Sequence, residues 1–170
     1  MIWEIALGVL VVLLIYVMSI FNRFIFLRNN IKKSWANIDV LLKQRHDELE
    51  NLVAIVKGYT QHEQKVFEGV ASARLAFLKA ASVDEKAKAY KHEGVAMKSL
   101  FAVAESYPEL KASSNYLKLQ ARITELEDEI ADRREFYNDS VTIFNTRIDQ
   151  VPYNIVAGML KFHPRVLFRA

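Results

Sequence analysis

The sequence of 170 residues contains no cysteine and few residues that make turns. Without cysteine the chain cannot form disulfides, thiolate zinc sites or iron–sulfur clusters, and it has no cysteine nucleophile. Five glycines and three prolines are too few for the many turns of a β-sandwich or a Rossmann-type sheet, so both folds are disfavoured. The formal net charge of +3 gives no support to nucleic-acid binding.

Charged side chains are also absent from the run Ile5–Phe21, which predicts a membrane anchor. With Ile2 and Trp3 the apolar stretch reaches about 20 residues, enough to cross a hydrocarbon core of about 30 Å. The alternative is a cleaved secretory signal, which has positive charge before its apolar run and a small-residue cleavage site after it. Neither feature occurs here, so we expect a retained signal-anchor. The predicted anchor residues are Ile5, Leu10, Leu14 and Phe21.

Basic residues follow the apolar run but do not precede it. By the positive-inside rule, the N-terminus is expected outside and everything after Phe24 in the cytoplasm. Residues 22–45 carry six basic and one acidic residue, whereas residues 46–160 carry 14 basic and 18 acidic ones. The basic residues next to the run are therefore expected to contact anionic lipid. They are Arg23, Arg28, Lys32 and Lys33.

Apolar residues then recur at alternating spacings of four and three, which is typical of a helix. The first seam contains Ile31, Trp35, Ile38, Leu42, Arg45, Leu49, Leu52 and Val56. No glycine or proline separates this stretch from the anchor, so both are expected to form one helix. Gly58 suits the left-handed position after a helix end, and Thr60 with Glu63 matches a capping box for a new helix. One uninterrupted helix through Gly58 is the alternative.

Further start signals divide the rest of the chain. A helix is expected over 63–81, a third begins at Ser82 and ends near Pro108, and a last one runs from Ser113 to about Asp149. The predicted fold is all-α, with an N-terminal transmembrane helix continuing into a cytoplasmic antiparallel bundle of three to four long helices. The expected segments are 1–24, the anchor; 25–150, the bundle; and 151–170, an amphipathic basic C-terminal segment near the membrane.

Two arginines occupy seam positions that are otherwise apolar. Arg45 lies in the first seam and Arg133 in that of the last helix, and we expect them to share one polar core layer with carboxylates from 47–50 and 125–129. The alternative is that each stem packs at the seam edge while its head reaches water.

The C-terminal segment mixes aliphatic, aromatic and basic residues, as segments at a lipid interface do. Lys161, Arg165 and Arg169 are the predicted membrane-surface contacts. The alternative is a tail that folds back on the apolar base of the bundle.

Several stretches, in order along the chain, resemble the LemA family of bacterial membrane proteins. They are IDVLLKQRHDELENLVAIVKGYTQHE, AVAESYPELKAS, ITELEDEIADRREFYNDSVTIFN and PYNIVAG. The resemblance implies an N-terminal transmembrane helix, a helical cytoplasmic domain and a place in the bacterial inner membrane. The tail after PYNIVAG is more basic than the apolar, glycine- and phenylalanine-rich tail that the family leads us to expect.

No pattern for chemistry is found. The chain has no Glu-x-x-His, no H-E-x-x-H, no G-x-S-x-G and no phosphate-binding glycine loop, so we expect no catalytic residues, metal, cofactor, nucleic acid or small-molecule substrate. We expect a non-enzymatic scaffold, docking or self-assembly module whose partners are the lipid bilayer and further copies of itself or other membrane proteins. Alternatives are an accessory subunit of envelope transport or signalling, and a membrane-remodelling protein.

Overall fold

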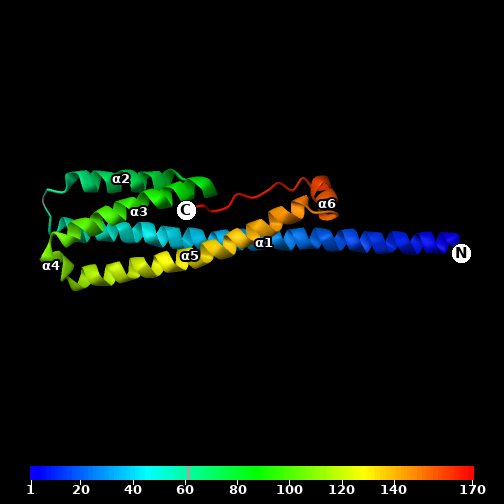
Figure 1. Ribbon diagram of the computed structural model, residues 1–170, viewed down its shortest axis with the longest axis horizontal. Helices are drawn as coiled ribbons and strands as arrows, with labels where there is room; N and C mark the ends of the chain where they lie inside the picture. The colour runs from blue at the N-terminus through cyan, green and yellow to red at the C-terminus, as the bar shows by residue number, and fades with distance from the viewer. Residues whose placement is uncertain (61) are drawn as a thin grey trace. The chain divides into compact units, whose positions relative to one another are not determined.

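The computed structural model describes residues 1–60 and 62–170, and all regular structure within them is helical (Figure 1). The prediction of an all-α fold is confirmed. The helices are α1 (Ile2–Lys57), α2 (Gln64–Lys79), α3 (Val83–Glu105), α4 (Pro108–Lys111), α5 (Ser114–Asp149) and α6 (Tyr153–Met159).

Helix α1 is one continuous helix of 56 residues, as the lack of breakers after the apolar run predicts. It ends at Lys57, so the alternative of an uninterrupted helix through Gly58 is wrong. The Gly58 N–H donates to Ile55 O at 3.0 Å and the Tyr59 N–H to Val56 O at 3.0 Å, which tightens the last turn. Gly58 does not have a positive φ, so the expected left-handed position is also wrong.

The two predicted capping boxes have different outcomes. Thr60 Oγ1 donates back to Val56 O at 3.1 Å, and α2 begins only at Gln64, so the box on Thr60 and Glu63 is wrong. Gln61, inside that motif, lies outside the described residues. The start at Ser82 is confirmed: its Oγ accepts from the Glu85 N–H at 3.2 Å, and Glu85 Oε2 accepts from the Ser82 N–H at 3.0 Å.

The chain packs as two compact units. The first comprises Met1–Trp35 with Phe136–Leu167, and the second comprises Ala36–Glu135 with Phe168–Ala170. These units describe packing alone. The three segments expected from the sequence concern position relative to a membrane, and they stay a prediction.

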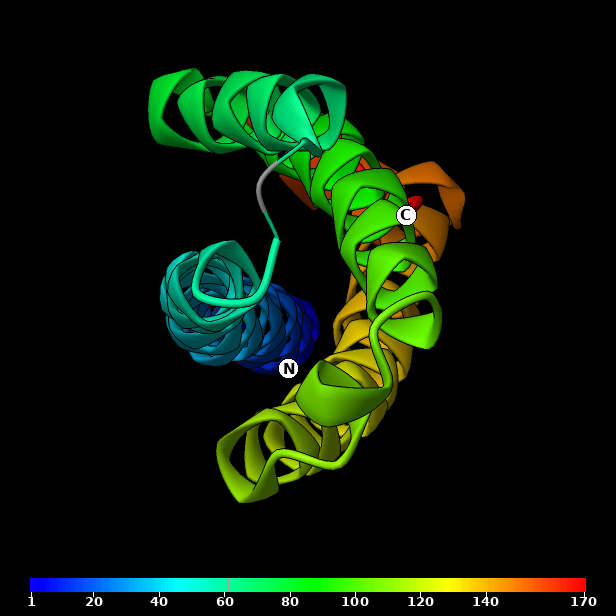
Figure 2. The same cartoon turned by 90° about the vertical axis from the view of Figure 1, so that its left-hand side faces the viewer.

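The second unit is a bundle of four helices that alternate in direction. The last part of α1, then α2, α3 and α5 run up and down in turn, as the colours in Figure 1 show and as Figure 2 shows from the α4 end. Their apolar faces meet in one core, because each seam repeats at helical spacing. The core contains Leu49, Leu52, Val56, Val70, Ala73, Ala96, Met97, Leu100, Ala104, Leu110, Tyr116, Leu119 and Ile123.

The first unit has an aromatic core around Phe24 of α1, which is 1% exposed. Its ring centroid lies 5.8 Å from that of Phe144 on α5 and 5.2 Å from that of Phe162 after α6. Further along, Tyr137 Oη donates to Val166 O at 2.9 Å, and Asn145 bonds both backbone polar atoms of Arg165. The tail therefore folds back along α5, which was the alternative expectation for this segment.

The apolar start of α1 remains uncovered. Only 6% of the most apolar 18-residue window in this helix is buried, whereas the core helix of a water-soluble protein would be mostly buried. This single N-terminal helix is long and apolar enough to cross a membrane.

Candidate functional site

The predicted anchor residues lie on the uncovered part of α1. Ile5, Leu10, Leu14 and Phe21 are exposed by 63%, 53%, 56% and 40%. All the predicted membrane-surface residues are exposed except Arg28, which is half-buried. All of them belong to the first unit except Arg169, which belongs to the second. They are Arg23, Arg28, Lys32, Lys33, Lys161, Arg165 and Arg169.

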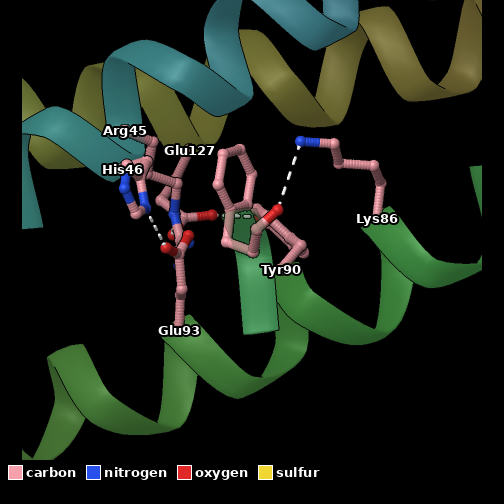
Figure 3. Close-up of polar contacts among 7 residues, drawn as sticks. Arg45, His46, Lys86, Tyr90, Glu93 and Glu127 are labelled. Carbon is pink, nitrogen blue, oxygen red and sulfur yellow. Dashed lines mark hydrogen bonds and ion pairs between the residues drawn. The ribbon is translucent and has the colours of Figure 1, made fainter. Parts of the chain in front are cut away.

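Arg45 is at the centre of an ionic cluster inside the second unit. Its side chain is 1% exposed and lies between carboxylates from two other helices. Nε donates to Glu127 Oε1 on α5 at 2.6 Å, and Nη1 donates to Glu93 Oε2 on α3 at 3.4 Å. Figure 3 shows these side chains converging from three helices. The guanidinium also lies 4.4 Å from the ring centroid of Tyr90, whose hydroxyl donates to Glu127.

His46 and Glu93 extend the cluster toward α2. Nδ1 of His46 and Oε1 of Glu93 share a hydrogen bond of 2.6 Å, and both side chains are buried. The His46 ring stacks on the Phe77 ring of α2, with 4.6 Å between the ring centroids. Lys86 Nζ lies 3.7 Å from the centroid of the Phe77 ring. The His46–Glu93 bond is therefore buried beside an aromatic side chain, which keeps water from it.

Burial sets the electrostatics of the cluster. Loss of water raises the pKa of the Glu93 carboxyl above 4.5, although His46, Arg45 and Lys86 oppose that rise. Burial and the bond to Glu127 raise the pKa of Tyr90 to about 12, so the phenol stays neutral and donates its proton to the carboxylate. The arrangement joins α1, α3 and α5 at one level, as a buried polar layer that fixes helix register does.

Arg133 is not part of this layer. Its side chain is exposed, so its expected place in the core beside Arg45 is wrong. The α5 seam continues from Ile130 to Tyr137 through the half-buried Arg134, four residues after Ile130 rather than three. Arg134 Nη1 donates to Ala170 O at 3.0 Å.

The sequence reasoning found Arg45 and the acidic stretch containing Glu127 but missed the other members. Heptad spacing predicts an α3 seam of Ala87, Tyr90, Gly94, Met97, Phe101 and Ala104. Three of these, Ala87, Met97 and Ala104, are buried, whereas Tyr90, Gly94 and Phe101 are only half-buried. The other buried positions of α3 include Glu93, among alanines and Leu100. A glutamate at helical spacing among Ala89, Ala96, Leu100 and Ala104 is the signal that could have revealed it.

A cavity of about 650 Å³ opens beside the cluster. Arg45 and Glu127 reach it from inside, Lys91 and Lys98 line it from α3, and Phe101 is among its apolar lining residues. Gly94 also lines it, and a Cβ added there would lie 3.4 Å from Arg45 Nη2. In the part of the chain that the structure describes, no group of three or more His, Asp or Glu side chains is placed to hold a metal ion.

The uncovered apolar segment of α1 and the helical packing define a membrane-associated helical-bundle protein. The model of the LemA family matches residues 34–170, and the chain belongs to that family.

Curated relatives are more distant. The chain is 23% identical over 168 residues to the magnetosome proteins MamQ 1 and MamQ 2 of Paramagnetospirillum magneticum, and 21% identical over 168 residues to the magnetosome protein MamQ of Magnetospirillum gryphiswaldense. Each match covers 84% of this chain but only 62% of the relative's length.

Proposed function

We propose that this protein is a non-enzymatic, single-pass protein of the bacterial inner membrane whose helical bundle is a cytoplasmic scaffold. The observation that carries the membrane anchor is the exposure of the apolar window in α1, of which 6% is buried. Exposing such a surface to water is unfavourable by about 25 cal/mol per Å² of apolar area, whereas a bilayer removes that cost.

The proposed orientation follows from charge. Arg23, Lys32 and Lys33 are exposed after the apolar run, and the positive-inside rule keeps such residues in the cytoplasm. Because the sequence has no cysteine, single-cysteine variants report location without background labelling. In intact spheroplasts, a membrane-impermeant maleimide should label Glu4→Cys and should label Lys118→Cys only after permeabilisation. The reverse pattern would contradict the orientation, and equal labelling of both would contradict a single span.

A scaffold also needs a surface for partners, and we propose that a further copy of this chain is one of them. The bundle exposes large apolar side chains on adjacent helices, with Leu75 and Leu78 on α2 and Val95 on α3 exposed by 56%, 68% and 64%. The mass of the full chain in detergent should exceed that of a monomer, and Leu78→Glu should lower it. A strict monomer that also forms no crosslink to another protein in native membranes would refute the scaffold.

A second candidate function, an accessory subunit that responds to a ligand, is favoured by the cavity beside Arg45. Lys91 and Lys98 line it together with the Arg45–Glu127 ion pair and apolar residues, so cations exceed carboxylates in its lining. Small carboxylates and phosphates should then raise the melting temperature of the full chain, and Lys91→Ala should weaken the effect. If no compound in such a panel raises the melting temperature, this candidate is wrong.

A further inference from the structure

Helix α6 has two faces of opposite environment, although both are apolar. Val156 and Ala157 face the first unit and are exposed by only 6% and 1%. Val151, just before the helix, and Ile155 and Met159 within it are exposed by 77%, 62% and 78%. Residues spaced by four lie along one side of a helix, so Ile155 and Met159 form a single uncovered face, which we call the outer face of α6.

Aromatic contacts fix α6 beside the end of the apolar run of α1. The ring centroid of Tyr153 lies 6.3 Å from that of Phe24. The ring centroid of Phe162, shortly after α6, lies 5.2 Å from that of Phe24. Phe24 is three residues after Phe21, the last residue of the uncharged run, and is therefore about 5 Å further along the helix axis. The headgroup region on each side of a bilayer is about 5–8 Å deep. If the run spans the hydrocarbon core, α6 lies at the level of the headgroups.

The charges near this face complement an anionic surface. Arg23 is exposed one residue before Phe24, and Lys161 and Arg165 are exposed in the segment that follows α6. Arg147 lies 4.9 Å over the ring of Tyr153, and Asp149 is the acidic residue at the nearby end of α5. Cations thus outnumber acids around a face of exposed aliphatic side chains, the composition that suits the boundary between acyl chains and anionic headgroups.

We propose that the outer face of α6 inserts into the boundary between headgroups and acyl chains of an anionic bilayer, as a second membrane contact beside the anchor. This inference rests on the proposed anchor in α1. It assigns to α6 a lipid contact that holds the base of the chain at the membrane surface, in addition to the span itself. A second copy of the chain packing on the same face is the competing occupant.

The test uses the full chain in nanodiscs of phosphatidylcholine and phosphatidylglycerol, with an environment-sensitive NBD label on a single cysteine. Ile155→Cys reports on the outer face and Val12→Cys on the anchor. Leu117→Cys, also aliphatic and 50% exposed on α5, is the matched control. Replacing the lipids by brominated ones should reduce the fluorescence at Ile155 and Val12 by about twofold or more and leave that at Leu117 unchanged. Adding Met159→Asp should abolish the quenching at Ile155 and preserve it at Val12.

Three other results would contradict the lipid contact of α6, and they differ in what they say about the anchor. Quenching at Val12 with none at Ile155 overturns the lipid contact of α6 and leaves the anchor standing. No quenching at Val12 overturns the anchor and with it the proposed function. A label at Ile155 that is insensitive to brominated lipid but self-quenches as more copies occupy each nanodisc shows that a second copy covers the face, and this also overturns the inference.

Discussion

Replacing Arg45 by leucine tests whether the buried ionic cluster is one interacting unit. Arg45 bonds Glu127 and Glu93, and its removal leaves Glu93, 1% exposed, with only His46 and Lys86 to oppose its burial. Removing one partner of a buried pair costs about 3–5 kcal/mol, because the other charge stays buried and unpaired. For a chain of this size that corresponds to a loss of about 6–20 °C in melting temperature.

The stability lost in Arg45→Leu should depend on pH, and the Glu93 carboxyl sets the direction of that dependence. Burial raises the pKa of Glu93 above 4.5 in the folded protein, so the folded state holds this proton more tightly than the unfolded state does. The contribution of the group to stability is full below pH 4.5 and falls as the pH rises through the raised pKa. Arg45→Leu raises that pKa further, so its cost should be larger at pH 8 than at pH 5.

Thermal unfolding of the full chain in detergent, followed by far-ultraviolet circular dichroism, measures both effects. Arg133→Leu is the matched control, because it makes the same substitution at an exposed position of α5 and should change stability by less than about 0.5 kcal/mol. Adding Glu93→Leu to Arg45→Leu should recover part of the loss, since the buried carboxylate that has lost its arginine is then gone. If Arg45→Leu is as stable as wild type at both pH values, the cluster does not couple the helices.

Three further predictions use the same unfolding measurement. Ser82→Ala removes the hydroxyl that caps α3 and should cost about 0.5–2 kcal/mol, and an unchanged melting temperature would contradict the capping box. Phe168→Ala removes a fully buried ring that lies 6.1 Å from that of Tyr90 and should cost about 3–5 kcal/mol, whereas Val166→Ala, 57% exposed, should cost little. Gly94→Ala gains about 1 kcal/mol of helix propensity while its Cβ meets Arg45 Nη2 at an ordinary 3.4 Å, so it should be neutral or stabilising, and a clear loss would refute this.

Much of the helical organisation could be predicted because its signals are local. The apolar run, the seam from Ile31 to Val56 and the box at Ser82 each depend on residues within a few turns of one another. The box at Thr60 failed although it has the same letters, since its hydroxyl bonds to Val56 O instead. A capping pattern states which bonds a side chain can make, and neighbouring backbone groups decide which one forms.

The members of the ionic cluster could be predicted only in part from the sequence. Arg45 stands out in sequence because it interrupts an apolar seam, and Arg133 stands out for the same reason, yet only Arg45 is buried. A helix repeats every 3.6 residues, so a seam can pass through position three or position four after Ile130. Packing against the other elements selects Arg134 at position four.

The sequence by itself determined that this chain is helical throughout its regular structure, carries an uncharged apolar run at its start and belongs with the LemA proteins, because periodicity, composition and family pattern are properties of the order of residues. Only the tertiary structure decided that Glu93, His46 and Tyr90 join Arg45, and that α6 lies against Phe24 with an uncovered outer face. These contacts join residues far apart in the chain, and their register follows from how whole helices pack, which no local pattern encodes.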